Sequence, residues 1–184
     1  PLMNTSSGTY TLTASYSGDG YYESATGTTS HSVLRNNPTV AFSNVTPSPA
    51  YVGQNYTVAV QVSGSAGVPS GTVTISDGMG SQCTPTLTSG NANCTLSSSP
   101  AGSRTLTATY NGDTVYRTGT ATHSHNIIRQ TPTIEILSDS PDPSYPYQRY
   151  TVSVRIYGDV AGVPNPSGTI QISNAAGGTC NATI

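Results

Sequence analysis

Short stretches in which apolar and polar residues alternate run along most of the chain. Between residues 56 and 62, for example, Tyr56, Val58, Val60 and Val62 are separated by threonine, alanine and glutamine. An apolar residue at every second position is typical of a β-strand with one buried face, because successive side chains point to opposite faces. Clusters of glycine, proline and asparagine separate these stretches, and none has a sustained helical period. The pattern therefore predicts an all-β fold.

The alternating pattern also repeats at a fixed distance. Residues 8–22 (GTYTLTASYSGDGYY) return 94 positions later as residues 102–116 (GSRTLTATYNGDTVY). A shift of 94 aligns residues 1–66 with residues 95–160 without a gap, and 26 of these 66 positions are identical. A repeat of fixed period indicates an array of similar structural units.

The period divides the chain into one complete unit and two partial units. Residues 37–130 form the complete unit, residues 1–36 correspond to its last third, and residues 131–184 correspond to its first half. Three residues are inserted in the last partial unit, so GVPSGTVTI at 67–75 returns as GVPNPSGTIQI at 162–172. Partial units expose an apolar face and open strand edges. We prefer the hypothesis that the chain is a segment of a longer tandem protein; the alternative is a subunit whose two ends are completed by neighbouring copies.

Seven strands are predicted in the complete unit. They lie near residues 38–43, 55–63, 71–76, 82–87, 91–97, 102–110 and 120–128. Seven short alternating strands in about 94 residues are typical of an immunoglobulin-like sandwich. The last strand of a unit runs almost directly into the next unit, as in HSVLRNNPTV and HNIIRQTPTI. Two or three linking residues with a proline leave little hinge freedom, so we expect stiff junctions.

The repeated run G-x-x-T-L-T-A-x-Y-x-G-D-x-x-Y and the opening P-T-[VI] strand resemble bacterial immunoglobulin-like (Big-type) repeat domains of secreted and cell-surface proteins. The resemblance covers the whole chain and implies tandem immunoglobulin-like β-sandwiches. It implies that Tyr10 is a corner tyrosine whose hydroxyl bonds to nearby backbone, and that Leu12 stands where antibody domains have a cysteine. In the second copy Arg104 takes the place of Tyr10. The other repeated residues are expected to have structural roles: Tyr16, Asp19, Tyr22, Leu106, Tyr110, Asp113 and Tyr116.

The composition argues against nucleic-acid binding, isopeptide cross-links and membrane insertion. Only 8% of the residues are charged, the net charge is −2, and the six basic residues are all arginine. The chain therefore has no basic surface for a phosphate backbone, and we expect no nucleic-acid binding. Without lysine it cannot form Lys–Asn isopeptide cross-links. No apolar run reaches the ~18–20 residues of a transmembrane helix, so we expect no membrane insertion in this segment.

Catalytic motifs are missing from the sequence. It has no G-x-S-x-G element, no Cys/His pair, no phosphate-binding loop and no paired carboxylates in a plausible cleft. A two-sheet sandwich of this size also offers little concavity. We therefore expect a protein that is not an enzyme and that holds no cofactor.

The cysteines predict one disulfide. Cys83 and Cys94 flank the turn TSGNAN in two stretches, QCTPTL and ANCTLS, that predict a hairpin. We expect a disulfide across this hairpin, which implies an oxidising, extracellular compartment at the cell surface or beyond it; free buried thiols are the alternative. Cys180 takes the place of Cys83 in its own unit, so its partner is expected outside this segment.

Glycan attachment is a weaker hypothesis. Five asparagines begin an N-x-[ST] motif: Asn4, Asn44, Asn55, Asn93 and Asn181. The chain is so rich in serine, threonine and asparagine that composition nearly accounts for them. N-linked and O-linked glycans both stay open at this point.

Two pairs of residues raise the question of a metal. His123 and His125 lie two apart on a predicted strand and face the same way, but no third ligand is evident, so we expect exposed polar side chains. Asp19 and Asp113 lie in Gly-Asp turns. Calcium needs about six to eight oxygen ligands, and we prefer a tight turn in which the aspartate bonds to nearby backbone.

One weak calcium hypothesis remains at a junction between units. Asp139 and Asp142 lie near the start of the third unit, where an interdomain ion could bind. With only eight acidic residues in the chain, we do not expect a designed metal site.

Two classes of function follow. The first, which we prefer, is a structural segment of an extracellular fibre, stalk or giant surface adhesin, whose partners are neighbouring immunoglobulin-like domains of the same or adjacent chains. The rival is an adhesin module that binds a surface glycan or protein through the tyrosine- and aspartate-rich loops within residues 138–168. A third hypothesis, also structural, is a filament subunit that assembles by complementation of its split terminal domains.

Overall fold

The computed structural model describes residue 2 and residues 6–184. Every regular element in this part of the chain is a β-strand, which confirms the predicted all-β fold. None of the described residues belongs to a helix that is long and apolar enough to cross a membrane.

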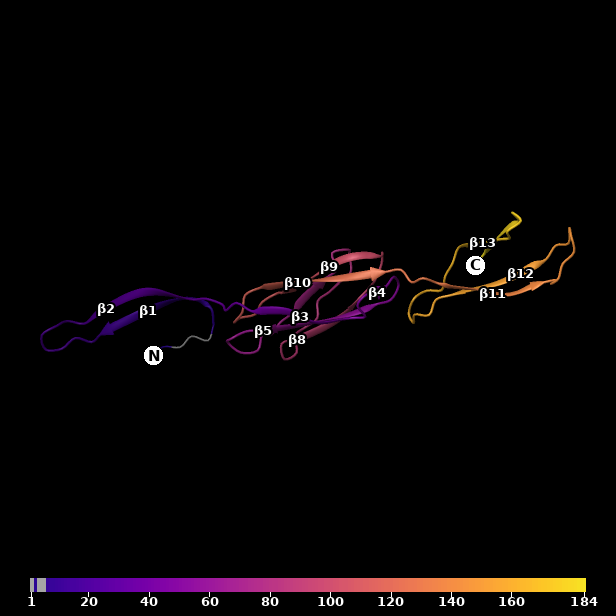
Figure 1. Cartoon of the computed structure of the whole chain (residues 1–184). Helices are drawn as coiled ribbons and strands as arrows, with labels where there is room; N and C mark the ends of the chain where they lie inside the picture. The colour runs from indigo at the N-terminus through magenta and orange to yellow at the C-terminus, as the bar shows by residue number, and fades with distance from the viewer. Residues whose placement is uncertain (1, 3–5) are drawn as a thin grey trace. The chain divides into compact units, whose positions relative to one another are not determined.

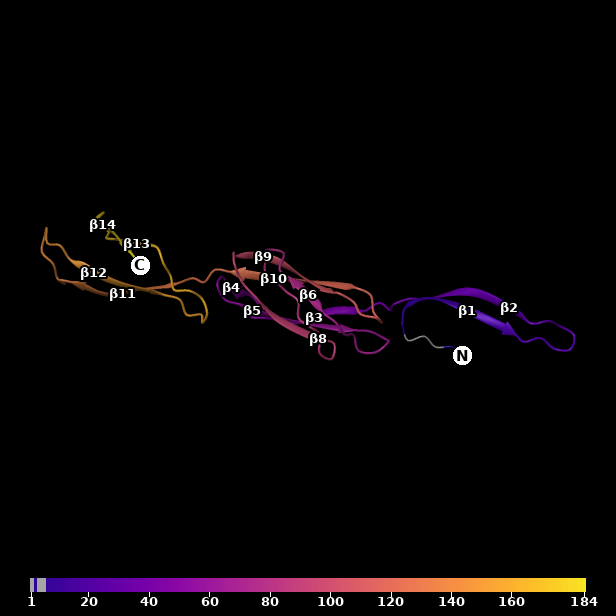
Figure 2. The same ribbon diagram turned by 180° about the vertical axis from the view of Figure 1, so that it is seen from behind.

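The middle of the chain forms an immunoglobulin-like sandwich of two sheets (Figures 1 and 2). The smaller sheet has the order β3 (Thr39–Thr46), β5 (Tyr56–Ser63), β8 (Asn91–Leu96). The larger sheet has the order β4 (Ala50–Tyr51), β10 (Gly119–Ile128), β9 (Gly102–Tyr110), β6 (Val73–Ser76), β7 (Gln82–Cys83). β3 pairs antiparallel with β5, whereas β4 pairs parallel with β10, with Ala50 opposite Ile127.

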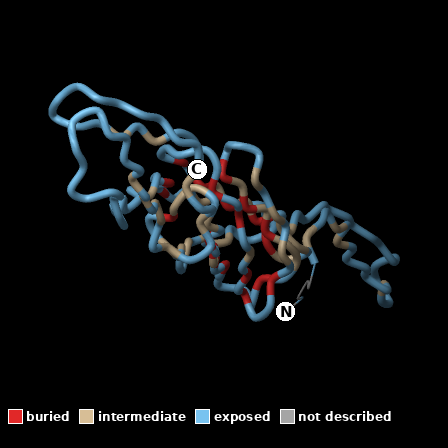
Figure 3. Tube along the Cα trace, turned by 90° about the vertical axis from the view of Figure 1, so that its right-hand side faces the viewer, coloured by how far each residue is buried: buried red, intermediate tan, exposed pale blue. Residues whose placement is uncertain are grey.

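The core lies where the alternating pattern places it. Along β5, Tyr56, Val58 and Val60 are fully buried and the residues between them face outward. The apolar side chains of β6 and β9, which belong to the larger sheet, are buried as well, so the two sheets enclose one core. In Figure 3 the buried segments lie in this middle part of the chain. Burying one such side chain contributes about 1.5–3 kcal/mol, so the core is the main source of stability.

Strand β4 was not predicted from the sequence. The chain leaves the smaller sheet after β3 and joins the larger sheet at β4, with Pro47 and Pro49 in between. Proline has no N–H to donate to a ladder, so it breaks the pairing at this point. The two residues of β4 are too short a run to show an alternating pattern.

The other six strands form three antiparallel pairs outside the two sheets of the sandwich. β1 (Gly8–Tyr16) and β2 (Ala25–Val33) form an antiparallel hairpin. β11 (Thr133–Ser140) pairs with β12 (Thr151–Tyr157), and β13 (Thr169–Ser173) pairs with β14 (Thr179–Thr183). Their apolar side chains are not enclosed as those of the middle are.

The chain divides into two compact units. One contains the residues up to 47 together with 57–96 and 104–125; the other contains 48–56, 97–103 and 126–184. The boundaries at residues 36 and 130 that the repeat predicts are not tested by this division and stay a prediction.

Candidate functional site

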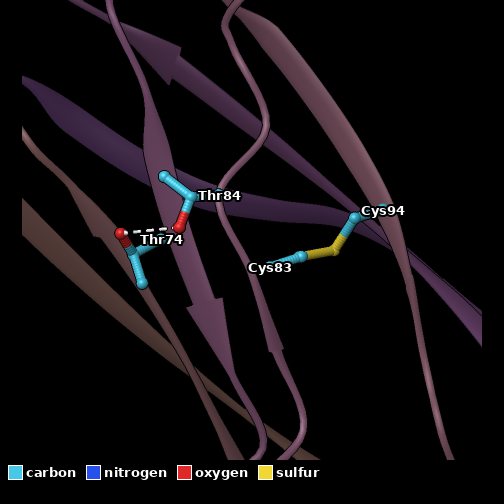
Figure 4. Close-up of a disulfide and its surroundings, with 4 residues drawn as sticks. All are labelled: Thr74, Cys83, Thr84 and Cys94. Carbon is cyan, nitrogen blue, oxygen red and sulfur yellow. Dashed lines mark hydrogen bonds between the residues drawn. A yellow bond between two sulfur atoms is a disulfide. The ribbon is translucent and has the colours of Figure 1, made fainter.

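The disulfide joins the two sheets of the sandwich. Cys83 of β7 and Cys94 of β8 are bonded, with their Cα atoms 6.5 Å apart (Figure 4). β7 is the edge strand of the larger sheet and β8 is the edge strand of the smaller one. The two strands that carry the cysteines therefore do not pair with each other as the predicted hairpin requires, although the predicted turn between them is present: Thr88 and Asn91 exchange two backbone hydrogen bonds. The segment after Cys83 stays beside β6, where Thr86 bridges to Thr72, and only then does the chain cross to the other sheet.

Removing this disulfide is expected to destabilise the sandwich by about 3 kcal/mol, because the bridge closes a loop with a sequence separation of 11 in the unfolded chain. The measurement is the denaturant midpoint of the Cys83→Ala/Cys94→Ala variant. Cys180→Ala is the matched control, since Cys180 is a free, exposed thiol and its loss should leave the midpoint within error. Equal midpoints for all three proteins would contradict the prediction.

A buried ion pair holds the turn that follows β6. Arg104 of β9 donates from Nη1 to Asp77 Oδ2, and both side chains are almost fully buried. Asp77 Oδ1 also accepts hydrogen bonds from the backbone N–H groups of Met79 (2.8 Å) and Ser81 (3.0 Å). The carboxylate therefore connects this turn to β9. A buried ion pair stabilises the fold only while both partners are present, because either charge alone would be buried without compensation.

His125 is buried, and the prediction of an exposed side chain was wrong for it. It is 1% exposed, whereas His123 is exposed and its ring lies 5.4 Å from that of Phe42. Burial lowers the pKa of His125, and the positive charges of His123 and Arg104 lower it further. His125 is therefore neutral in the folded protein at neutral pH.

This burial predicts a loss of stability in mild acid. The unfolded chain binds a proton at His125 near pH 6.5, but the folded chain resists it, so stability is complete above that pH and is lost as the pH falls below it. The melting temperature should drop between pH 7.5 and 5.5, and His125→Gln should flatten the drop. His31→Gln is the control, because His31 takes the same place in β2 and is exposed. A slope that His125→Gln leaves unchanged would overturn this assignment.

The corner tyrosine implied by the family resemblance lies in the first hairpin. Tyr10 donates its hydroxyl to the backbone oxygen of Ser6 at 2.9 Å. Leu12, two residues on, is half-buried, whereas its counterpart Leu106 is fully buried. The repeated residues thus occupy the same strand positions but differ in how far they are enclosed.

The two Gly-Asp turns have the same local structure. Asp19 Oδ1 accepts from the N–H groups of Tyr21 and Tyr22, and Asp113 Oδ1 accepts from those of Val115 and Tyr116, all at 2.7–2.9 Å. These are the backbone bonds of a tight turn. Within the described residues no three His, Cys, Asp or Glu side chains are grouped for a metal, and the junction calcium stays a prediction.

Asp113 additionally anchors the loop before β6. Its Oδ2 accepts from the backbone N–H of Ser70 at 2.9 Å and from the Ser70 hydroxyl at 3.1 Å. Burial alone would raise the pKa of Asp113, but the hydrogen bonds from Ser70, Tyr116 and Val115 outweigh it and hold the pKa well below its usual range. The carboxylate therefore stays ionised and keeps the turn closed.

Tyr116 fills the space beneath the loop at residues 64–67. Its ring lies so close to Gly64 that a Cβ added there would be 2.1 Å from Cε1 of the ring. Its hydroxyl accepts from the N–H of Ala66 at 2.6 Å and donates to the oxygen of Gly67 at 2.8 Å. Only glycine at position 64 leaves room for this ring. Tyr110 is buried with it, whereas Tyr16 and Tyr22, their counterparts in the first hairpin, are exposed.

The linker between the first two predicted units is bonded to the same turn. The N–H of Asn36 donates to the oxygen of Val115 at 2.8 Å, and the N–H of Arg117 donates to the oxygen of Asn36 at 2.9 Å. A Cβ added at Gly119 would also lie 2.9 Å from Cγ of Pro38. Both backbone groups of one linker residue are thereby held by the β9–β10 turn.

The remaining candidate residues lie on the surface. Asn44, Asn55, Asn93 and Asn181 are exposed, while Asn4 lies outside the described residues; glycan attachment stays a prediction at all five. The third unit exposes Tyr145 and Tyr147 almost completely, and Asp139 and Asp142 are exposed as well.

Comparison with known proteins adds one finding for the middle of the chain. The model of a family described as "Bacterial Ig-like domain (group 3)" matches residues 43–128. These residues include all of β4 to β10 and the second half of β3. Comparison with curated proteins gave no match for the chain.

Proposed function

Because residues 43–128 form a bacterial Ig-like domain, we propose that the chain is a structural segment of an extracellular fibre, stalk or giant surface adhesin. Domains of this family are typically non-enzymatic and usually occur in extracellular or surface proteins. The role proposed for this chain is to supply length and stiffness, and its partners are the neighbouring immunoglobulin-like domains of the same array.

One observation carries the proposal: the linker is part of the sandwich next to it. Asn36 contributes both of its backbone hydrogen-bonding groups to the turn at Val115–Arg117. A flexible linker would leave those groups to water, whereas here any bend at Asn36 must break two hydrogen bonds. Pro38, two residues later, fixes its own φ and restricts Asn37. The junction therefore resists bending.

The disulfide supports the extracellular part of the proposal. Disulfides persist in oxidising compartments and are rare in the cytosol. Cys83–Cys94 joins one edge strand of the larger sheet to one edge strand of the smaller sheet. A domain that has to keep its length outside the cell gains from such a link.

The test of stiffness is ¹⁵N relaxation of the full chain. We expect amides of β1–β2 and of the central sandwich to report one common rotational correlation time. A variant with a Gly-Ser-Gly-Ser insertion between Asn36 and Asn37 should show two separate, shorter times. Separate times in the protein without the insertion would refute a stiff junction.

A second candidate function rests on the exposed tyrosines of the third unit. Tyr145 is 81% exposed, and the Tyr147 side chain is fully in solvent; exposed aromatic rings can stack on sugars or pack on a protein. This function predicts glycan-array binding that is lost in Tyr145→Ala/Tyr147→Ala. Binding that the double variant retains, or no binding at all, would leave the structural role alone.

A further inference from the structure

The larger sheet of the central sandwich presents an outward face of hydroxyl side chains. Along β9 the buried residues Leu106 and Ala108 alternate with threonines that point outward. Thr74 of β6 lies opposite Thr109 of β9, and its hydroxyl oxygen is hydrogen-bonded at 3.4 Å to that of Thr84, which follows β7 (Figure 4). On β9 and β10 the outward positions are Thr105, Thr107, Thr109, Thr120, Thr122 and Ser124. None of these outward residues is charged, aromatic or aliphatic.

The same chemistry returns in the other copies of the repeat. β1 and β2 repeat β9 and β10 at a spacing of 94, and their corresponding positions are Thr11, Thr13, Ser15, Thr26, Thr28 and Ser30. These residues pair across the hairpin, as Thr13 does with Thr28. β13 repeats β6 at a spacing of 97 and carries Gln171 where β6 has Thr74. The positions compared are therefore uncharged in all three units, and the six on β9 and β10 have a hydroxyl in both copies.

The outward face of the smaller sheet does not keep its chemistry in this way. In the central sandwich Ala41 on β3 lies opposite Gln61 on β5. In the third unit the same two places are taken by Glu135 on β11 and Arg155 on β12, again opposite each other. The preference of exposed strands for threonine acts on both faces alike, so it does not account for a difference between them. The hydroxyls of the larger sheet are therefore retained for a reason particular to that face.

The composition of this face suits a second copy of itself. A threonine or serine hydroxyl both donates and accepts hydrogen bonds, so two such faces can bond to each other in more than one register. The chain has a net charge of −2, and like charges that face each other across a contact are unfavourable. A face without charge avoids this repulsion between copies. Aromatic rings, which would favour a sugar ligand, are absent from the outward positions named above.

The size of the face favours a repetitive partner. Four strands about 4.8 Å apart, each contributing about five residues at ~3.3 Å per residue, cover roughly 300 Å². A stable interface buries about 800 Å² on each partner, so a single face binds its copy weakly. Contacts that recur once per unit reinforce one another, because the first contact raises the effective concentration for the next. A second chain with the same 94-residue period offers one face for each unit, which a single globular partner does not.

We propose that adjacent copies of the chain associate side by side, with the outward faces of their larger sheets against each other. Both copies use the same surface, so the contact is isologous. The proposal rests on the structural role stated above and specifies which face meets an adjacent chain. A chain with a stiff junction that does not pair in this way would retain the structural role and contradict only the lateral contact.

The test measures self-association of the full chain in ¹H–¹⁵N spectra recorded from micromolar to millimolar concentration. Cys180, a free and exposed thiol, is replaced by serine throughout to exclude disulfide-linked species. Because a single face binds weakly, we expect amide shifts that depend on concentration in the millimolar range, on β6, β9 and β10 but not on β3 and β5. Shifts that are absent at every concentration, or that avoid the larger sheet, overturn the proposal.

Opposite charges on the same face test the contact without depending on its register. Thr107→Lys/Thr122→Lys and Thr107→Glu/Thr122→Glu should each stay monomeric, because two like-charged faces repel each other. An equimolar mixture of the two variants should pair at least about tenfold more tightly than the unaltered chain. Pairing in the mixture also shows that neither variant has lost its fold.

The matched control places the same charges on the other sheet, at Thr57 and Gln61, which point outward from β5. At ~0.15 M salt, where charges that are not in contact are largely screened, these variants should self-associate like the unaltered chain and gain nothing on mixing. A face variant that still self-associates, a face mixture that stays monomeric, or a control mixture that pairs as tightly as the face mixture overturns the assignment of the contact to the larger sheet.

Discussion

Replacing Arg104 with methionine is expected to destabilise the central sandwich by about 3–5 kcal/mol, because it leaves the Asp77 carboxylate buried without its guanidinium partner. Asp77 is 2% exposed, so water cannot take the place of the arginine. The measurement is the free energy of unfolding in urea, followed by the fluorescence of the tyrosines, of which three are buried in the core. This is a loss large enough to unfold many domains of this size.

The control for Arg104 comes from the chain itself. Arg104→Tyr combined with Asp77→Asn places at the two positions the neutral residues that the repeat has there, Tyr10 in the first unit and Asn174 in the third. This double variant should recover much of the stability that Arg104→Met loses, since no charge stays unpaired. A double variant less stable than the single one would show that the ion pair itself, rather than the unpaired carboxylate, decides stability.

Tyr116→Ala is expected to have an effect of similar size, about 3–5 kcal/mol. The ring is fully enclosed, and its removal leaves a cavity beneath the loop at residues 64–67. It also removes the hydroxyl that bonds to Ala66 and Gly67. Tyr116→Phe should retain the ring and lose about 1–3 kcal/mol, the contribution of the unmet polar groups. The same urea titration measures both variants.

The repeat again supplies a matched control. Tyr22 stands at the same place in the sequence as Tyr116 but is mostly exposed, so Tyr22→Ala should change stability by less than about 0.5 kcal/mol. A large effect at Tyr22 in a dilute, monomeric sample would contradict the assignment of its ring to the surface. The comparison separates the identity of the residue from its surroundings.

Much of the fold could be predicted because the strands are amphipathic. Alternation along Tyr56 to Val62 identifies β5 and its buried face, and the family match at residues 43–128 confirms the recognised resemblance. Local turn chemistry was equally accessible, since an aspartate after glycine is suited to accept the bonds that Asp113 accepts. Both signals depend only on residues close together in the chain.

What escaped prediction depends on residues far apart in the chain. Nothing local to Cys83 shows that β7 and β8 belong to different sheets. His125 is a polar residue, for which exposure is the usual expectation, but it is buried in the sandwich. The partner of Arg104 is 27 residues away.

The parallel pairing of β4 with β10 has a consequence when the molecule is pulled. Force enters the sandwich through β3 and leaves it through the end of β10. Once β3 has separated from β5, the load reaches β4, and β4 and β10 are drawn past each other in opposite directions. The bonds that join them, including that from Val52 N–H to the oxygen of Ile128, are then loaded in shear and must break together rather than one by one. A tensile load along the chain thus meets mechanical resistance at Ala50–Val52, in one of the two shortest strands of the sandwich and its immediate continuation.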